Sequence, residues 1–443
     1  MREFSVTKLG AALVLGLIVN SPMLAAESDK IGADAKTPAT DAAFRRAAGE
    51  QAVKLPLGFR YEILVQGDIP EPLYLQFSPD GRLWFTGRRG QVWAYDFGTK
   101  THSQIAEIKV DWQQVKGKEA NERGLHGIEF HPDYLKNGFV YLYHTPLYGN
   151  GIYSNRLSRF TVDNPKKATA LNPDSEKVML EFVSLRGFHQ GGAVEYNPKD
   201  GKLYVSMGDN NVSSDTKNFW NDPKNPPQVL GLYQGKTLRL NLDGTVPKDN
   251  PFVKTPGAAP EVYTYGHRNP YSMHVDETTG QVYVGEVGYD RKQDWEEINR
   301  LKSGGNYGWP FLMGDGLTVF PTEETNRFPN AIKPFITYIH EAGANVTVGP
   351  VYHASGKGAF PKEFQGGMFY GDFTRKWVRF APIDANTQTV TNTIPFARGF
   401  GGGPIQMQLG QDGALYMAEY AGWFTGTPKD AISRIVYVGE DKK

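Results

Sequence analysis

The sequence contains no cysteine and carries no net charge. Without cysteine, the protein has no disulfide, no thiolate metal site and no thiol nucleophile. The 48 Lys and Arg residues balance 48 Asp and Glu residues, so no bulk field draws the chain to nucleic acid or to an anionic membrane. Any anion that binds must therefore be held by local groups.

Motifs of several common enzyme classes are also missing. The chain lacks the His-Glu-x-x-His pair of zinc hydrolases and the Gly-x-Ser-x-Gly elbow of serine hydrolases. It has no Walker phosphate loop, and no Gly-x-Gly-x-x-Gly turn opens a βαβ unit. These absences disfavour both hydrolase classes and a nicotinamide dehydrogenase on the usual fold.

Turn-forming residues are abundant instead. The 443 residues include 50 Gly and 29 Pro, and 13% are aromatic. Coiled coils and helical bundles contain few turn formers, and disordered chains contain few aromatic residues. The composition therefore favours a globular protein of short strands with frequent reversals.

The N-terminus has the pattern of a secretory signal peptide. Two basic residues precede an apolar run over residues 9–19, and small residues follow up to Ala26. The run is too short to span a bilayer, which needs about 20 residues. We expect residues 1–26 to be removed on export to the periplasm or the exterior, which leaves no membrane span, and residues 27–54 to form a flexible leader. An uncleaved anchor is the alternative.

One sequence motif recurs six times. It consists of a turn that ends in glycine, followed by a short apolar strand with an aromatic residue three positions after the glycine. The spacings are 57, 63, 79, 87 and 46 residues, and each leaves room for a four-stranded antiparallel sheet with one long loop. Each turn glycine suits a position with positive φ. The six glycines are Gly81, Gly138, Gly201, Gly280, Gly367 and Gly413.

Sheets that repeat radially protect their own edges. The sequence therefore predicts an all-β fold, a six-bladed β-propeller of four-stranded antiparallel sheets, as one domain over residues 55–443. An early strand at Tyr61–Val65 is expected to pair with Ser433–Tyr437 and close the ring. A β-sandwich is the alternative, but it does not require six similar units.

The loop Arg186–Gly192 is the first candidate site. His189, Gln190 and two glycines stand just before an apolar strand. Paired glycines allow a ligand to approach the backbone while the imidazole stays exposed, as a general base requires. An ordinary turn is the alternative, because glycine beside histidine is common in turns.

The segment Tyr265–Pro270 is the second candidate. The guanidinium fork of Arg268 and the amide of Asn269 suit a carboxylate or a quinone oxygen. Alternatively, Arg268 pairs with a structural acid and Asn269 forms a turn with Pro270.

The segment Gly285–Asn299 is the third candidate. Loop carbonyls beside several acids suit a hard cation such as Ca²⁺, which takes about 6–8 oxygen ligands. The spacing is not that of an EF-hand, and a solvated acidic loop is the alternative.

Five glycine-rich or polar segments follow one another in a set order: Gly124–Asp133, His189–Gly192, Gly235–Pro251, Gly266–Pro270 and Glu297–Pro310. Together they resemble the soluble family of glucose/sorbosone (aldose sugar) dehydrogenases that depend on pyrroloquinoline quinone (PQQ). The resemblance covers roughly residues 55–440 and is most specific between residues 120 and 310. It implies a six-bladed propeller exported to the periplasm.

The resemblance also implies roles for individual residues. His189 matches the general base, which takes the hydroxyl proton from C1 of a sugar while a hydride passes to PQQ. Arg268 and Asn269 match residues that contact the cofactor and stabilise negative charge on the reduced quinone. Glu122 falls where the family places a polar side chain on the substrate, and Gln190 beside the base is expected to join it.

The implied cofactors are PQQ and Ca²⁺. The carbonyls of Gly288 and Tyr289 match the positions that hold Ca²⁺, a Lewis acid towards PQQ. Lys376 is an approximate counterpart of a cofactor-binding lysine on the fifth blade. Arg398 is the one arginine where glucose-specific members carry two closely spaced arginines, and it is expected to reach inward.

The sequence therefore predicts an exported dehydrogenase that oxidises an aldose or related sugar to its lactone. Because no cysteine is present to attach a haem, electrons would leave through a separate periplasmic acceptor. Two alternatives stay open. One is a Ca²⁺-dependent propeller lactonase or related hydrolase in which His189 activates water, and the other is a non-catalytic carbohydrate- or protein-binding propeller that has lost PQQ.

Overall fold

The computed structural model describes most of the chain from residue 53 onward. The predicted signal peptide, residues 1–26, lies outside the described residues, as does most of the segment 27–54. All described residues belong to one unit, Ala39–Lys443, and none of their helices has the length and apolar character to cross a membrane. The described residues are 44–46, 53–112, 122–148, 153–167, 170–184, 186–210, 225–289, 295–314, 317–318, 330–340, 344–422 and 429–439.

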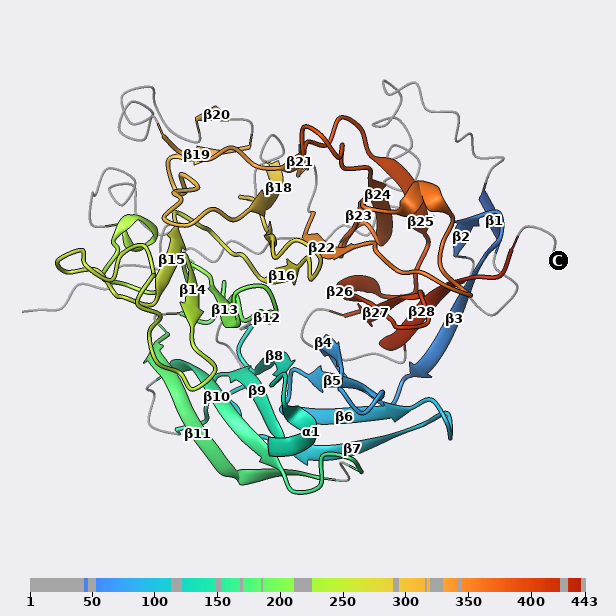
Figure 1. Ribbon diagram of the computed structural model, residues 1–443, viewed down its shortest axis with the longest axis horizontal. Coiled ribbons are helices and arrows are strands. Elements are labelled where there is room, and N and C mark those ends of the chain that lie inside the picture. The colour runs from blue at the N-terminus through green and yellow to red at the C-terminus, as the bar shows by residue number, and fades with distance from the viewer. Residues whose placement is uncertain are drawn as a thin grey trace, which may run out of the picture. The chain divides into compact units, whose positions relative to one another are not determined.

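Six antiparallel sheets surround a central axis (Figure 1), which confirms the predicted all-β, six-bladed propeller. From the inner strand outward, the first three blades are β4 (Pro72–Phe77), β5 (Leu83–Gly87), β6 (Gln91–Asp96) and β7 (Thr101–Glu107); β8 (Leu125–Phe130), β9 (Phe139–His144), β10 (Ser154–Val162) and β11 (Leu171–Val183); and β12 (Val194–Asn197), β13 (Lys202–Met207), β14 (Lys236–Leu240) and β15 (Val262–Tyr265).

The last three blades follow the same order. They are β16 (Ser272–Val275), β17 (Val282–Glu286), β18 (Trp295–Arg300) and β21 (Ile336–Ile339); β22 (Val346–Val351), β23 (Met368–Asp372), β24 (Trp377–Ala381) and β25 (Ile394–Arg398); and β26 (Gly403–Leu409), β27 (Leu415–Tyr420), β28 (Ala431–Tyr437) and β3 (Phe59–Gln66). The remaining elements are the hairpin β19 (Leu312–Met313) and β20 (Leu317–Thr318), the helical turn α1 (Tyr134–Asn137), and the 3₁₀ turns Pro226–Gln228 and Lys362–Phe364.

The ring closes as predicted, because β3 pairs antiparallel with β28. Tyr61 stands opposite Ile435 in this register, and Ile63 stands opposite Ser433. Figure 1 shows the two strands side by side, β3 in blue and β28 in red. The first long strand of the chain thereby completes the last blade.

Two short strands extend the fifth blade. β1 (Phe44–Arg46) pairs with β2 (Lys54–Pro56), and Lys54 pairs with Arg398 of β25. The segment predicted as a flexible leader over residues 27–54 thus contains residues that cover the outer edge of a sheet. A strand of three residues is too short to show a period in the sequence, but it shields an edge that would otherwise stay open.

The apolar part of each of the six repeated motifs forms the second strand of a blade. Their aromatic residues are all buried between neighbouring sheets: Trp84, Tyr141, Tyr204, Tyr283, Tyr370 and Tyr416. Five of the six turn glycines have positive φ, as expected, but Gly367 does not, because its neighbour Gly366 takes φ 74°. Position 367 requires glycine for another reason: a Cβ there would lie 2.1 Å from Cζ of Phe380.

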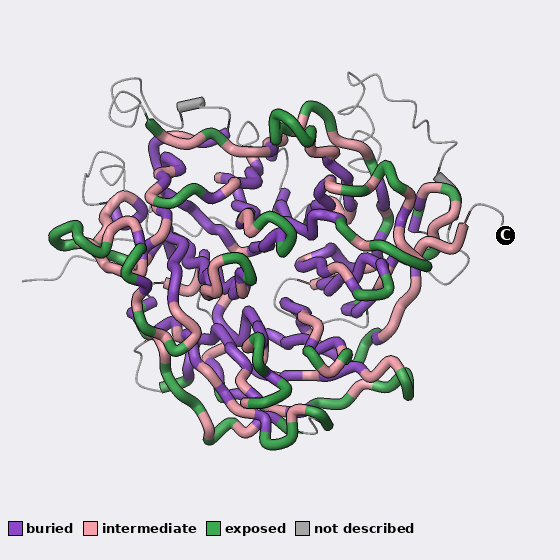
Figure 2. The backbone as a smooth tube through the Cα atoms, viewed as in Figure 1, coloured by how far each residue is buried: buried purple, intermediate pink, exposed green. Residues whose placement is uncertain are grey.

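Figure 2 shows the strands around the axis mostly as buried backbone and many of the connecting loops as exposed. Between blades five and six, Phe59 of β3 meets Phe360 and Phe396 edge-on, with ring centroids 4.8 and 5.1 Å apart. Such pairs contribute about 0.5–1.5 kcal/mol each beyond the burial of their surface. These contacts fix the closing blade against its neighbour.

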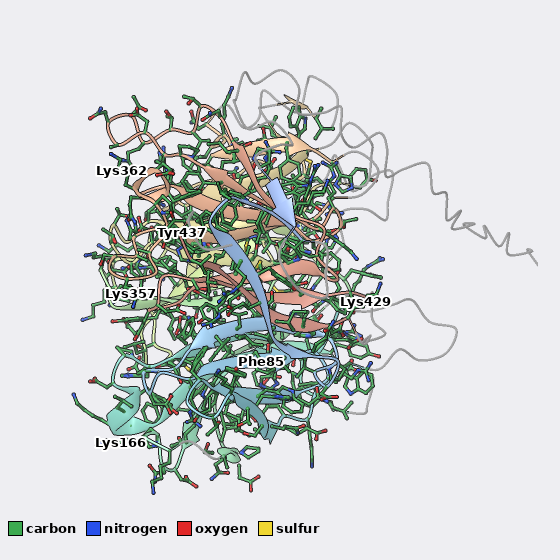
Figure 3. All side chains as sticks on the ribbon, turned by 90° about the vertical axis from the view of Figure 1, so that its right-hand side faces the viewer. Phe85, Lys166, Lys357, Lys362, Lys429 and Tyr437 are labelled. Carbon is green, nitrogen blue, oxygen red and sulfur yellow. The ribbon has the colours of Figure 1, made fainter. Side chains whose placement is uncertain are left out.

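The two ends of the propeller differ in the loops they carry. In each blade the inner strand begins, and the second strand ends, at the same end of the propeller, because the strands are antiparallel. Lys429, just before β28, lies at this end, and Lys166, Lys357 and Lys362 lie at the opposite one (Figure 3). All three candidate segments of the sequence fall at the end that carries Lys429, which we call the mouth.

Candidate functional site

Loops from neighbouring blades meet at the mouth around a cavity of about 90 Å³. His189 precedes the inner strand β12, Arg268 and Asn269 precede β16, and Gly288 follows β17. The cavity is lined by Leu73, Tyr74, Arg88, Glu122, His126, Gly191, Asn269, Tyr271, Val287, Asn345, Phe373, Ile405 and Tyr420. Of the predicted site residues, Glu122 and Asn269 line this cavity, whereas His189, Arg268 and Gly288 lie in loops at the same mouth without lining it.

His189 is held by two acids. Its Nδ1 atom lies 2.6 Å from Oδ1 of Asp209, and its backbone N–H donates to Oε2 of Glu122 at 2.8 Å. A carboxylate only accepts hydrogen bonds, so Nδ1 carries a proton in this contact, and in the neutral imidazole Nε2 is then the nitrogen with the lone pair. His189 also has φ 52°, a left-handed conformation that costs a non-glycine residue about 1–2 kcal/mol. The imidazole is therefore oriented and set in the tautomer that a base requires.

Asp209 is the functional residue that the sequence reasoning missed. It is fully buried, and its second carboxyl oxygen accepts the indole N–H of Trp309 at 2.8 Å. The signal was present, because Asp209 follows β13 after one glycine and so lies at the same mouth as His189. Trp309 belongs to a segment that carried the family resemblance, but nothing in the sequence assigned it a contact.

Arg268 is a buried cation. Its side chain lies 5.7 Å from the ring of Tyr289 and 5.6 Å from the ring of Trp309, and Nη1 donates to the Val287 carbonyl at 3.0 Å. Only 3% of the residue is exposed, and no carboxylate among the described residues forms an ion pair with its guanidinium. Buried charges are normally compensated, so this guanidinium is suited to an anionic ligand.

Asn269 faces the cavity beside Arg268. Its Oδ1 accepts the backbone N–H of Gly191 at 3.3 Å, while its Nδ2 donates to none of the residues described in the structure. Gly208 allows this close packing, because a Cβ there would lie 2.2 Å from the His189 carbonyl oxygen and 2.8 Å from Oδ1 of Asn269. The amide N–H₂ of Asn269 is available to a ligand.

The described acids of the segment Gly285–Asn299 bond groups within the fold: Glu286 bonds His267, Glu296 bonds His340 and Glu297 bonds Asn299. The Gly288 N–H donates to Glu296 at 3.0 Å, and its carbonyl accepts nothing from the residues that the structure describes. Glu296 is buried and also bonds His340 at 2.6 Å. Burial and the neighbouring Glu286 raise the pKa of Glu297 to about 8. Asp290 and Asp294 lie outside the described residues.

No group of three or more His, Asp or Glu side chains within the described residues could hold a metal ion. Among the described residues of this segment, the carbonyl oxygens of Gly288 and Tyr289 are the donors that the sequence predicts for Ca²⁺. The donor set is small, but it is made of the oxygen ligands that Ca²⁺ prefers.

The two predicted substrate residues differ in availability. Glu122 lines the cavity, where burial raises its pKa and the nearby His189 opposes that effect. Gln190 is fully buried, and its side chain bonds within its own loop, to Ser184 and to the carbonyls of Arg186 and Phe188. Gln190 thus stabilises the loop, and a contact with substrate stays a prediction.

Lys376 and Arg398 do not line the cavity. Lys376 lies in the turn between β23 and β24, where its Nζ donates to the Gly401 carbonyl at 2.8 Å and burial lowers its pKa. Arg398 ends β25, opposite Trp377. Their roles in cofactor binding stay predictions.

A larger hollow of about 700 Å³ lies at the opposite end, between blades one and six. Three of its four charged groups pair with one another, because Arg434 bonds Glu62 at 2.9 Å and Asp412 at 3.0 Å, while the fourth, Lys100, is exposed. Aromatic rings, including Phe77 and Tyr416, complete the wall. No uncompensated group comparable to Arg268 distinguishes this hollow as a site.

The chain folds as a six-bladed β-propeller whose candidate site lies at one end of the axis. The profile of the family described as Glucose / Sorbosone dehydrogenase matches residues 69–422. The chain therefore belongs to this family.

Two curated relatives carry names that state an activity. Quinoprotein glucose dehydrogenase B of Acinetobacter calcoaceticus is 30% identical over 308 residues, which cover 64% of this chain and 58% of that protein. Aldose sugar dehydrogenase YliI of Escherichia coli is 28% identical over 262 residues, which cover 58% of this chain and 62% of that protein. The matches thus span about three-fifths of each relative.

A solved structure shares the fold. The PQQ-bound form of aldose sugar dehydrogenase from Streptomyces coelicolor superimposes with a TM-score of 0.64 at 21% identity, covering 86% of this chain and 99% of that one. At this identity the similarity concerns the propeller alone.

Proposed function

We propose that this protein is a PQQ- and Ca²⁺-dependent dehydrogenase that oxidises an aldose or related sugar at C1 to the lactone. The observation that carries the proposal is the pairing of His189 with Asp209 beside Arg268, a buried cation without a carboxylate partner in the described part of the chain. Membership of the glucose/sorbosone dehydrogenase family supports it.

His189 takes the hydroxyl proton of the sugar at Nε2. Asp209 holds the opposite nitrogen and stabilises the imidazolium that forms, as an orienting acid does for a histidine base. Trp309 donates to the other oxygen of Asp209, which keeps that carboxylate in place. Glu122 lines the cavity beside the base and accepts hydrogen bonds from hydroxyl groups of the sugar.

The residues at the mouth fit the cofactor. PQQ is a planar, anionic quinone, and when bound it supplies the hydride acceptor. Arg268 and Asn269 would hold its carboxylate and quinone oxygens, and the rings of Tyr289 and Trp309 offer flat apolar surfaces. The Gly288 and Tyr289 carbonyls would hold Ca²⁺. The signal peptide predicted over residues 1–26 supports a periplasmic or secreted location, and electrons leave to a separate acceptor.

Reconstitution tests this function. Purified apo-protein is mixed with PQQ and Ca²⁺, and reduction of an artificial dye is followed with a panel of aldoses. Activity that requires PQQ and is lost in His189→Ala, but kept in His102→Ala on the outer strand β7, is the expected result. Absence of PQQ binding at micromolar concentration would refute the proposal. Lactone hydrolysis without PQQ would instead favour a lactonase, and PQQ binding without turnover of any sugar would favour a binding protein.

A further inference from the structure

Lys236 is fully buried at the start of β14. Its Nζ donates three hydrogen bonds, to the carbonyls of Pro226 at 2.7 Å, Pro227 at 3.0 Å and Gln234 at 2.8 Å. Burial lowers the pKa of this amine, whereas three carbonyl acceptors favour the ammonium, which alone has three N–H groups to give. All three carbonyls are therefore satisfied by one side chain.

Two of the three carbonyls that Lys236 binds belong to a turn that also contacts Trp309. These two come from Pro226 and Pro227, at the start of the 3₁₀ turn Pro226–Gln228. Gln228, which ends this turn, donates from Nε2 to the Trp309 carbonyl at 2.6 Å. The Trp309 indole in turn donates to Asp209. Three hydrogen-bonded contacts, joined by the backbone and side chains of Gln228 and Trp309, thus connect Lys236 to the acid that bonds His189.

The register of blade three places Lys236 between the two loops of the site. It stands opposite Met207 of β13 and Tyr265 of β15. The chain continues from these residues to Asp209 and Arg268, respectively. The preceding residue, Gly235, joins both loops, because it donates to Gly208 at 3.1 Å and accepts from His267 at 3.2 Å.

We propose that Lys236 is a positioning residue for the His189–Asp209 pair: its buried amine clamps the turn Pro226–Gln228, which holds Trp309 against Asp209. The catalytic consequence rests on the proposed function, but the clamp itself does not. A role limited to the stability of blade three would leave the geometry at Trp309 and His189 unchanged.

The test uses NMR of the full-length apo-protein, without sugar or PQQ. In Lys236→Met, exchange of the Trp309 indole N–H with solvent becomes at least tenfold faster, while the Trp84 indole N–H, buried in blade one, keeps its rate. The imidazole ¹⁵N signals of His189 move from a single tautomer towards a mixture. Lys202→Met, the same change on the neighbouring strand β13 at a partly exposed site, alters neither signal.

Gln228→Leu provides a second variant that breaks the next link and leaves Lys236 in place. It should reproduce both changes, and the double variant with Lys236→Met should add nothing further, because both act through Trp309. The proposal would be overturned if a folded Lys236→Met protein showed the wild-type exchange rate at Trp309 and the wild-type tautomer at His189. If Lys236→Met does not fold, the same result in Gln228→Leu would overturn it. If the wild-type protein showed no PQQ-dependent activity, that result would count against the proposed function but not against the role of Lys236.

Discussion

Nδ1 of His189 lies 2.6 Å from Oδ1 of Asp209, and the two residues come from the two loops that flank the inner strands of one blade. Asp209 is fully buried and also bonds Trp309. Asp209 therefore joins His189 to Trp309, and its contact with Nδ1 directs Nε2 away from the acid.

Asp209→Asn should lower kcat of the reconstituted enzyme by about 10³- to 10⁴-fold, because an amide can stabilise the wrong imidazole tautomer. PQQ affinity should stay within about twofold, since Asp209 is shielded from the cavity. Steady-state dye reduction and a PQQ titration measure the two quantities. Asp163→Asn, an exposed acid after β10, serves as the control, and a variant with kcat within tenfold of wild type would contradict this role.

Arg268→Gln should weaken PQQ binding by about ten- to a hundredfold, the loss expected for one charge-assisted hydrogen bond to an anion. The free energy of unfolding of the apo-protein should stay equal or rise, because the variant removes a buried charge that has no carboxylate partner among the described residues. A PQQ titration and urea unfolding measure these effects.

Arg300→Gln, at the far end of β18, is the matched control for Arg268→Gln and should leave PQQ affinity unchanged. Strong destabilisation of Arg268→Gln together with unaltered PQQ affinity would show that this guanidinium is structural.

Gly367→Ala should reduce the free energy of unfolding by about 1–3 kcal/mol, because a Cβ would lie 2.1 Å from the ring of Phe380 and the core would have to shift. Gly366→Ala meets no atom within 4 Å but has φ 74°, so it should cost about 1 kcal/mol through backbone strain. Urea unfolding of both variants measures the difference. Equal costs would mean that the packing at Phe380 is loose.

The pH dependence of stability should reflect Glu419. Burial raises the pKa of this carboxyl from 4.5 to about 7. Between these two values the folded state keeps a proton that the unfolded state has lost, so stability falls as the pH rises through this window, and the full cost applies above about pH 7. In Glu419→Gln the fall from pH 4 to pH 8 should be smaller by up to about 3 kcal/mol.

Urea unfolding across this pH range measures the effect of Glu419→Gln. Glu363→Gln, an exposed site in the 3₁₀ turn Lys362–Phe364, is the control and should follow the wild-type curve. Parallel curves for wild type and Glu419→Gln would mean that Glu419 is charged at neutral pH in the folded protein.

The fold was predictable because each blade repeats a local pattern. A turn glycine and the aromatic residue three positions later, as at Gly201 and Tyr204, reflect turn and strand preferences that depend on only a few neighbouring residues. The exception at Gly367 arose because two adjacent glycines shared the turn, and only packing against Phe380 separates their roles.

The site was predictable only in part. His189 and Arg268 stand in glycine-rich loops, so the residues beside them in the sequence indicate a site. Asp209 is recognised only through its contact with His189, which lies 20 residues away on another loop. Lys236 showed no signal, because a lysine at the start of a strand is usually solvated, and its three carbonyl partners are visible only after folding. Whether Arg398 points towards the axis depends on where β25 ends relative to it, and the sequence does not show that position.

The pairing of β3 with β28 sets the order of events during synthesis. β3 ends at Gln66 and its partner ends at Tyr437, so about 370 residues are made before the last blade can form. At about 5–20 residues per second this takes roughly 20 to 70 s. During that time the ring stays open and β3 has an unsatisfied edge. The closing blade therefore completes only after the final strand of the chain has been made.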